Sequence, residues 1–246
     1  MQLRSIILSF GLILTVSVHA QTLFTAAGVN SGGNGISEAH HDGTNAMAQG
    51  VFNDLNGYAH AEVNYGSLHT YAHAMNTAGN LYSWASAQSM FTDQLTITGG
   101  TGTGYFIADF KVDGTLQANY SAFSNTGLYW SNMPSGIPGN VQGGNHTYQG
   151  TTAIPFTYGV PFDFYAQMIS NVIFVAGGFG EGLADFSNTA KLTATHVYDP
   201  SFNPVGGTTI TSASGHFYPQ AVPEPAPFAV LGVGTITLLR RRTKRS

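Results

Sequence analysis

The sequence predicts an all-β fold: a single antiparallel β-sandwich, jelly-roll-like, flanked by an N-terminal signal helix and a short C-terminal hydrophobic helix. Three observations predict it. Apolar and polar residues alternate with a period of two along much of the chain. The 31 glycines and 10 prolines disfavour helices, and charged residues are only 8% of the total, so the Glu–Lys pairs that support helices are scarce. With 43% apolar and 12% aromatic residues, the 246-residue chain is also unlike a charged disordered protein.

Residues 1–20 have the three parts of a secretory signal peptide. Arg4 supplies the positive charge, residues 6–16 form the apolar core, and Val18 and Ala20 are the small residues that a signal peptidase recognises. We therefore expect cleavage between Ala20 and Gln21. The alternative is an N-terminal core helix, for which no partner face is found downstream.

Strand patterns dominate the second half of the body. The predicted strands are residues 90–98, 105–112, 115–120, 160–170, 184–195 and 208–214. Asp113-Gly114 is predicted to be a two-residue hairpin turn. The other predicted loops are residues 99–104, 177–182, 199–207 and 124–150, the last being the longest because it is rich in Gly, Asn, Ser and Pro.

The region of residues 26–87 gives a weaker signal. Aromatic residues or histidines alternate with alanine along residues 58–74, which favours a pair of strands turning at Gly66-Ser67. A helix beginning near Tyr58 is the alternative, although Gly57 and Gly66 weaken it.

Charge is distributed unevenly along the chain. Residues 21–221 carry two basic and eleven acidic side chains, a net charge of −9, whereas five of the eight basic residues lie in the last seven positions. Such a body lacks the Lys and Arg that phosphate binding needs, which excludes nucleic acid as an expected partner. The chain contains no cysteine, which excludes disulfides, thiolate metal sites and cysteine nucleophiles.

The C-terminus has three parts in a fixed order. A proline motif precedes a mainly apolar segment, residues 226–239, and then a cationic tail. The motif is Val222, Pro223, Glu224 and Pro225, and the tail begins with Arg240, Arg241 and Arg242. This order resembles the PEP-CTERM sorting signal. The resemblance implies export, temporary retention in the inner membrane, processing by an exosortase-type membrane protease, and delivery to the cell surface or the extracellular space.

The physical properties of this tail agree with the resemblance. As a helix, residues 226–239 would span about 21 Å, against a hydrocarbon core of about 30 Å, which suits temporary retention. The positive-inside rule keeps Arg4 and the arginine cluster in the cytoplasm and the body on the far side. Pro223 and Pro225 would keep the motif extended for a protease. The alternative is an ordinary C-terminal tail anchor.

Two body segments, residues 85–116 and 184–199, resemble sequences common in the exported domains that carry this sorting signal. The resemblance implies one sandwich domain from about residue 25 to residue 220. We therefore divide the chain into a signal peptide (1–20), an exported domain (21–221) and a sorting signal (222–246).

Histidines are the first candidates for chemistry. His40, His41, His60, His69 and His73 fall within 34 residues, near Asp42, Asp54 and Glu62. His60 and Glu62 would share a strand face and could meet His69 across a hairpin, so these three are the candidate metal ligands. The alternative is that they are exposed members of alternating strands, since no HExxH or comparable spacing is present. No cofactor is expected.

No catalytic residue is predicted. The chain has no Gly-x-Ser-x-Gly elbow, and residues 177–182 lack the Lys-Ser/Thr of a phosphate loop. Asp163, Glu181 and Asp185 are candidates for a carboxylate pair in glycoside cleavage, but the sequence does not give their separation.

Exposed aromatic rings are candidates for sugar binding. These are Tyr82, Trp84, Tyr129 and Trp130, and the alternative is that they are core or loop-anchoring residues. Asn- and Asp-rich loops would supply hydrogen bonds or calcium ligands.

Together these observations predict an exported, non-catalytic protein of the cell surface or extracellular matrix. Its expected partners are signal peptidase and the export machinery, an exosortase-type protease and exopolysaccharide. The alternatives are a carbohydrate- or calcium-binding module and a secreted hydrolase acting on polysaccharide.

Overall fold

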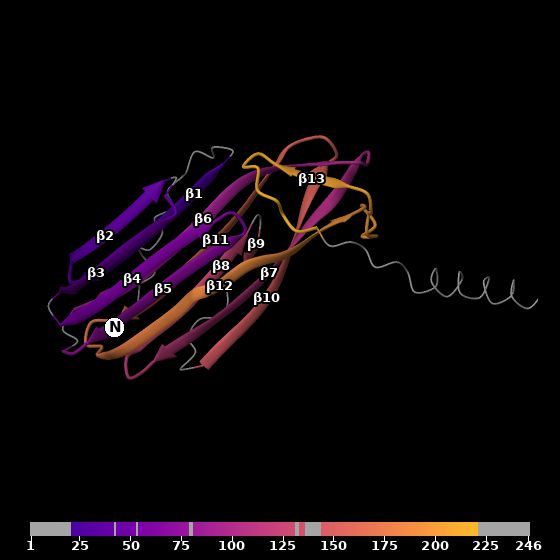
Figure 1. Cartoon of the computed structure of the whole chain (residues 1–246). Coiled ribbons are helices and arrows are strands. Elements are labelled where there is room, and N and C mark those ends of the chain that lie inside the picture. Colours follow the sequence, from indigo (N-terminus) through magenta and orange to yellow (C-terminus); the bar gives the residue numbers. More distant parts are fainter. Residues whose placement is uncertain are drawn as a thin grey trace, which may run out of the picture.

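A computed structural model describes residues 21–41, 43–52, 54–78, 81–130, 133–135 and 144–220. Strands account for most of this part of the chain, which contains no helix (Figure 1). The all-β prediction is therefore confirmed. The predicted signal helix and C-terminal helix lie outside the described residues. Among the described residues there is also no helix of the length and apolarity needed to cross a membrane.

The strands form two sheets in which every pairing between neighbours is antiparallel. The first sheet has the order β2-β1-β6-β11-β8-β9, and β13 pairs with β6. Its strands are β1 (Thr22–Ser31), β2 (Asn34–His41), β6 (Ser83–Thr98), β8 (Ala122–Trp130), β9 (Met133–Ser135), β11 (Phe162–Phe174) and β13 (Thr209–Ser212). The second sheet has the order β10-β7-β12-β5-β4-β3. Its strands are β3 (Asn45–Phe52), β4 (Leu55–Asn64), β5 (Ser67–Asn76), β7 (Thr103–Ala118), β10 (Gly144–Thr157) and β12 (Gly180–Tyr198).

The core lies between the two sheets, and its composition changes along the strands. The inner face of β6 passes from small to large side chains, in the order Ser83, Ala85, Ala87, Ser89, Phe91, Asp93, Leu95 and Ile97. In the half with small residues, Cα atoms of β4 lie within 8 Å of Cα atoms of β1 and β6 in the other sheet. This is closer than the usual sheet spacing of about 10 Å. Small inner side chains permit the close approach.

The other half of the core is built from aromatic rings. Phe164 makes edge-to-face contacts with Phe91 and Phe106, with ring centroids 5.6 and 5.4 Å apart. Tyr218, from the end of the described chain, packs on Phe164 in the same way, at 5.7 Å. The C-terminal residues therefore complete the core at this end.

A buried carboxylate holds these C-terminal residues in place. Asp93 is fully buried on the inner face of β6. Its Oδ2 accepts hydrogen bonds from the hydroxyls of Ser212 (2.6 Å), Ser214 (2.6 Å) and Tyr218 (2.8 Å), and its Oδ1 from the Ser214 N–H (3.2 Å). The Gln94 N–H adds a further bond at 2.8 Å. A buried charge needs such partners to remain stable.

The last described residues are fixed as well. The Thr195 N–H donates to the Pro219 carbonyl at 2.7 Å, and the Gln220 side chain donates to the Thr208 hydroxyl at 2.7 Å. We name residues 209–220, with their hydrogen bonds to Asp93 and β12, the C-terminal clasp. The described chain is thus anchored up to Gln220.

The predicted turn at Asp113-Gly114 is wrong, because β7 runs through it. Gly114 is needed there for space: a Cβ atom would lie 2.1 Å from Cδ1 of Phe186. The register of β12 shifts beside this position, between Asp185 and Thr189. The glycine therefore accommodates a neighbouring ring and a strand irregularity, not a change of chain direction.

The predicted loop at residues 124–150 is also wrong, since it contains most of β8, all of β9 and the start of β10. Ser124 and Thr126 were misleading because they are buried with satisfied hydroxyls. Ser124 donates to the Gln117 carbonyl at 2.6 Å, and the Thr126 hydroxyl lies 2.7 Å from that of Ser170. By contrast, the strand pair turning at Gly66 is confirmed as β4 and β5, so the alternative helix near Tyr58 is wrong.

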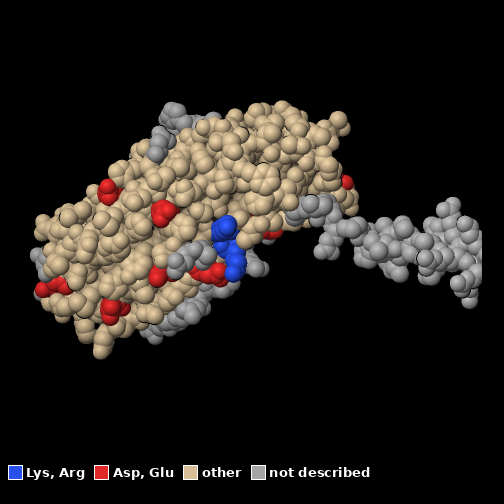
Figure 2. All heavy atoms as spheres, in the orientation of Figure 1, with Lys and Arg blue, Asp and Glu red and all other residues tan. Residues whose placement is uncertain are grey.

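Charged side chains are sparse on the face shown in Figure 2, where separate acidic groups and one small basic area are seen. The two lysines of the body, Lys111 and Lys191, lie directly opposite each other on β7 and β12. Lys111 pairs with Asp113 at 2.8 Å. Positive charge is therefore confined to one small area of the described body.

Candidate ligand-binding site

A pocket of about 440 Å³ lies on the outer face of the second sheet, where β7 ends and β12 begins. Its lining residues come from β5, β7, β12 and the turn after β7. They are Tyr71, His73, Gln117, Ala118, Asn119, Glu181, Gly182 and Leu183. We name it the Glu181 pocket.

Strand register brings the pocket residues together. Leu183 on β12 is paired with His73 on β5 and with Gln117 on β7, so these three residues form one row across the sheet. Alternate residues of a strand point to the same face. Tyr71 and Glu181, each two positions away on its own strand, therefore share that outer face.

A tight junction closes the end of the pocket. The backbone N–H of Asn119 donates to the Glu181 carbonyl at 3.0 Å, and the Glu181 N–H donates to Oδ1 of Asn119 at 2.6 Å. Gly180 has a φ of +130°, and a Cβ atom there would lie 2.6 Å from the carbonyl oxygen of Asn119. Glycine is therefore required for the two segments to approach this closely.

Two exposed aromatic residues are the sequence neighbours of this junction: Tyr120 follows Asn119, and Phe179 precedes Gly180. Tyr120 is 75% exposed and Phe179 is 48% exposed, and their ring centroids are 5.2 Å apart. Tyr120 has a φ of +51°, a left-handed conformation that is uncommon for a bulky residue. Such strain is concentrated at binding sites in proteins. The junction thus presents a pair of rings beside a polar pocket.

The polar groups of the pocket are paired but remain accessible. Nε2 of His73 lies 2.9 Å from Oε1 of Glu181, and both side chains are partly exposed. Burial, followed by the nearby charge of Asp185, raises the pKa of the Tyr71 hydroxyl. The Tyr71 ring is held by an edge contact with Tyr58, with centroids 5.4 Å apart. The pocket therefore offers donors and acceptors in fixed positions.

This arrangement suits a neutral polyhydroxylated ligand. Amide, imidazole, phenol and carboxylate groups match ligand hydroxyls, and exposed rings offer flat apolar faces. The pocket carries no Lys or Arg to bind an anionic group.

The structure places the candidate metal ligands on this same sheet. Glu62 is paired with His69 across the β4–β5 hairpin, and His60, two positions along, is paired with Tyr71. Nδ1 of His69 lies 2.6 Å from the Ser187 carbonyl, and its Nε2 lies 3.3 Å from the Ser67 hydroxyl. Both ring nitrogens of His69 are thus engaged. The described residues contain no group of three or more His, Asp or Glu arranged to hold a metal ion.

The remaining histidines of the cluster are separated. His73 belongs to the Glu181 pocket, whereas His40 and His41 lie on β2 in the other sheet. Nε2 of His40 pairs with Oε1 of Glu38 at 2.6 Å, and the His41 ring packs beside Phe24. These histidines are close in the sequence but do not form one site.

The candidate catalytic carboxylates are not brought together. Asp163 lies on β11 in the first sheet, while Glu181 and Asp185 lie on β12 in the second. Four residues along a strand correspond to about 13 Å, against about 5–9.5 Å between the carboxyl groups of glycosidases. The structure therefore does not supply the predicted carboxylate pair.

Two of the candidate sugar-binding rings cover glycines. Trp84 lies against Gly28, and Tyr129 lies against Gly127, where a Cβ atom would be 2.8 Å from each ring. Tyr82 is partly exposed in the loop before β6, and burial raises the pKa of its hydroxyl. Of Trp130 only the backbone position, paired with Ala166, is described. Tyr82, Trp84 and Tyr129 do not line the Glu181 pocket.

Sequence reasoning missed Asn119, Tyr120 and Phe179. The available signal was an aromatic residue next to turn residues at two places, Asn119-Tyr120 and Gly178-Phe179-Gly180. Pairing of β7 with β12 was needed to bring the two places together. Of the predicted processing residues, Gln21 is the first described residue and is exposed. Ala20, the motif of residues 222–225 and Arg240, Arg241 and Arg242 lie outside the described residues.

No family model matches this chain, and no curated protein matches it.

Proposed function

We propose that this chain is an exported, non-catalytic protein of the cell surface or extracellular matrix, sorted through its C-terminal proline motif. The observation that carries the proposal is the order of motif, apolar segment and arginine cluster in residues 222–246. This order begins two residues after Gln220, the last residue of the C-terminal clasp. The chain is held in the inner membrane through residues 226–239 until an exosortase-type protease acts at the motif.

The sorting proposal is tested in cells that encode an exosortase. Replacing Pro223 and Pro225 by alanine is expected to leave the unprocessed chain in the inner membrane, as measured by immunoblotting of membrane and extracellular fractions. The matched control is Pro200→Ala, which alters a proline of the folded body. Normal processing of the double variant would disprove the sorting assignment.

For the body, the function that the geometry supports best is binding of an uncharged carbohydrate. The observation in its favour is the Glu181 pocket with Tyr120 and Phe179 beside it. The net charge of −9 in residues 21–221 disfavours anionic polymers and is compatible with neutral ones. Exopolysaccharide is then the partner, provided that its chain is neutral.

Titration with neutral polysaccharides, followed by calorimetry, tests this function. We expect Tyr120→Ala and Phe179→Ala each to weaken binding by about tenfold, because an aromatic contact contributes about 0.5–1.5 kcal/mol beyond its buried area. Phe202→Ala is the control, since Phe202 is exposed to a similar extent but stacks on Tyr105 and not on the Tyr120–Phe179 pair. Equal binding by all variants and the unchanged protein would disprove a role for the Tyr120–Phe179 pair.

A secreted hydrolase and a calcium-binding module have less support. The separation of Asp163, Glu181 and Asp185 disfavours hydrolysis, and calcium binding has no cluster of ligands among the described residues. For the finer fold, we propose a jelly-roll-like sandwich. Along the runs β5-β6-β7-β8 and β9-β10-β11-β12-β13, each strand is followed in the chain by a strand of the other sheet, and this alternation favours the jelly-roll-like arrangement.

A further inference from the structure

The C-terminal clasp determines where the chain leaves the domain. The clasp holds residues up to Gln220, so only residues 221–225 separate the folded domain from the apolar segment that begins at residue 226. Five residues span at most about 18 Å when fully extended. The strands β6 and β7, with 16 residues each, are about 53 Å long. Anchoring through residues 226–239 therefore keeps the end that carries the clasp near the membrane.

Several loops form this end, which we name the clasp end. The Gly159 N–H donates to the Ile97 carbonyl at 2.8 Å, and the Tyr158 N–H to the Gly102 carbonyl at 3.0 Å. The clasp end thus consists of the β6–β7 and β10–β11 turns, residues 199–208 and the part of the clasp that pairs with the end of β6, Thr209–Ser212.

The clasp end exposes apolar side chains. Phe202 is 54% exposed and Val160 is 51% exposed. Phe202 stacks on Tyr105, with ring centroids 4.5 Å apart and an angle of 10° between the rings. Phe202 and Val160 lie on two different loops, so each loop contributes one apolar group to the surface.

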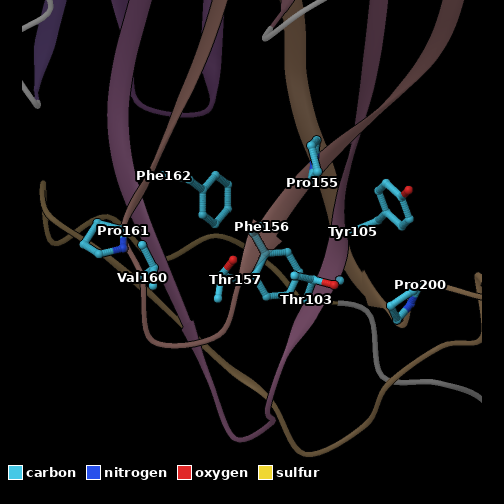
Figure 3. Close-up of a pocket in the computed structure, with 10 residues that line it drawn as sticks. Thr103, Tyr105, Pro155, Phe156, Thr157, Val160, Pro161, Phe162 and Pro200 are labelled. Carbon is cyan, nitrogen blue, oxygen red and sulfur yellow. The ribbon is translucent and has the colours of Figure 1, made fainter.

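An apolar cleft of about 450 Å³ opens between these loops (Figure 3). Figure 3 shows Val160, Pro161 and Phe162 on one side and Tyr105, Pro155 and Pro200 on the other, with Phe156 between them. The only side-chain polar groups in its lining are the hydroxyls of Thr103, Thr157 and Tyr105, and it contains no charged residue. Such a surface has no charged group with which to bind an ionic partner, but it can bury apolar groups of another molecule.

We propose that the clasp end rests on the lipid bilayer while the chain is anchored, with Val160 and Phe202 inserted into the bilayer interface. This inference rests on the proposed sorting function, because the anchor is residues 226–239. The short connector holds the end at a high effective concentration near the membrane, so that a few apolar side chains suffice for contact. Aromatic and aliphatic side chains on a surface are the groups that bind the headgroup boundary.

Charge favours a zwitterionic lipid surface over an anionic one. Asp163 and Asp199 lie at the clasp end, which has no Lys or Arg among its described residues. Hydrogen bonds from the Asn203 side chain and from the N–H groups of Asn203 and Ser201 lower the pKa of Asp199, so this group remains charged. The opposite end, with Tyr120, Phe179 and the Glu181 pocket, then faces away from the membrane and is open to a ligand.

The absence of cysteine permits a direct test. Single substitutions Val160→Cys and Phe202→Cys are labelled with an environment-sensitive nitrobenzoxadiazole dye in the full chain. Tyr120→Cys and Phe179→Cys are the matched controls at the opposite end. The labelled chains are reconstituted in phosphatidylcholine vesicles, and flotation in a density gradient is measured together with the dye emission. Circular dichroism verifies that each labelled variant is folded.

We expect every variant to float with the vesicles, and the two labels at the clasp end to gain about twofold in intensity with a shift to shorter wavelength. The two control labels should not change. If the chain floats but the clasp-end labels behave like the controls, the docking proposal is overturned and the anchor stands. If the chain does not float, both are overturned. If the change in dye emission increases with the amount of protein per vesicle and also occurs in detergent, the partner is a second copy of the chain. That result would overturn the proposal.

Discussion

The two ends of the domain use a carboxylate in opposite ways. Asp93, at the clasp end, is fully buried, and only hydroxyl and backbone N–H groups bind it. Glu181, at the other end, is exposed and pairs with His73 beside an open pocket. The buried carboxylate can act only on its own chain, whereas the exposed one is available to a ligand. The end of the sandwich at which a carboxylate lies thus separates a structural role from a binding role.

The core shows the same difference. At the clasp end, the inner side chains are large rings, and the C-terminal segment is needed to cover them. At the pocket end, serine and alanine bring the sheets close together, so that no extra segment is needed there. Four changes test this contrast, in decreasing order of their effect on the protein.

Removing the buried carboxylate should have the largest effect. Asp93→Ala leaves the hydroxyls of Ser212, Ser214 and Tyr218 without their acceptor inside the core. We expect a loss of about 3–5 kcal/mol in the free energy of unfolding, measured by urea denaturation and circular dichroism. Tyr218→Phe removes one of these bonds and should cost about 1–2 kcal/mol, which keeps the test informative if Asp93→Ala does not fold.

The matched control is Asp163→Ala, an exposed aspartate on the neighbouring strand β11. Its unfolding free energy should change by no more than about 0.5 kcal/mol. A similar small change in Asp93→Ala would contradict the role assigned to the clasp.

A change at the junction of the pocket should have an intermediate effect. Gly180→Ala places a Cβ atom against the Asn119 carbonyl at a φ that favours glycine. We expect a loss of about 1–3 kcal/mol in unfolding free energy, together with weaker binding of a neutral polysaccharide. Gly206→Ala is the control, because no atom lies within 4 Å of the Cβ position there. Unchanged stability of Gly180→Ala would mean that the junction rearranges without strain.

Alkaline pH should weaken the clasp. Burial, and then the negative charge of Asp93, raises the pKa of Tyr218 above its usual value. Above about pH 10, tyrosine in the unfolded chain loses its proton while folded Tyr218 keeps it, so the folded state binds more protons and stability falls as pH rises. The slope from this one group is at most about 1.4 kcal/mol per pH unit.

Urea midpoints measured between pH 8 and pH 11 test this dependence. Tyr218→Phe should show a shallower decline than the unchanged protein. The pKa values of Tyr71, Tyr82 and Tyr158 are raised as well. The stability of Tyr218→Phe should therefore still fall with rising pH, but with a smaller slope. Identical slopes would argue against an effect of Tyr218.

The exposed carboxylate should matter least for stability. Glu181→Gln removes the charge opposite His73, and pairs of this exposure contribute about 0–1 kcal/mol. We expect a change below about 1 kcal/mol in unfolding free energy, with a measurable loss of polysaccharide affinity in calorimetry. A large loss of stability would contradict the contrast between the two carboxylates.

Much of the fold could be predicted from local patterns. Period-two alternation along residues 105–112 and 184–195 located parts of β7 and β12, and alanine alternation located β4 and β5. Gly114 was misread because a turn glycine and a glycine that makes room for Phe186 look alike in sequence. Residues 124–150 were misread because Ser124 and Thr126 have loop-like chemistry until their hydroxyl partners on other strands are known.

The candidate site was much less predictable. His60, Glu62 and His69 were placed on one face correctly, because a hairpin fixes such neighbours locally. Asn119 and Glu181 are 62 positions apart, and only the pairing of β7 with β12 brings them together. The same holds for Asp93, whose partners lie about 120 residues away.

By itself, the sequence determined the alternation of the strands, the anionic and cysteine-free body, and the order of motifs at the chain ends. These properties depend on residues that are close along the chain, so composition and spacing are sufficient to determine them. Only the tertiary structure decided which carboxylate is buried in the clasp and which lines a pocket. The physical reason is that burial and pairing depend on strand register and sheet packing, which join residues distant in sequence.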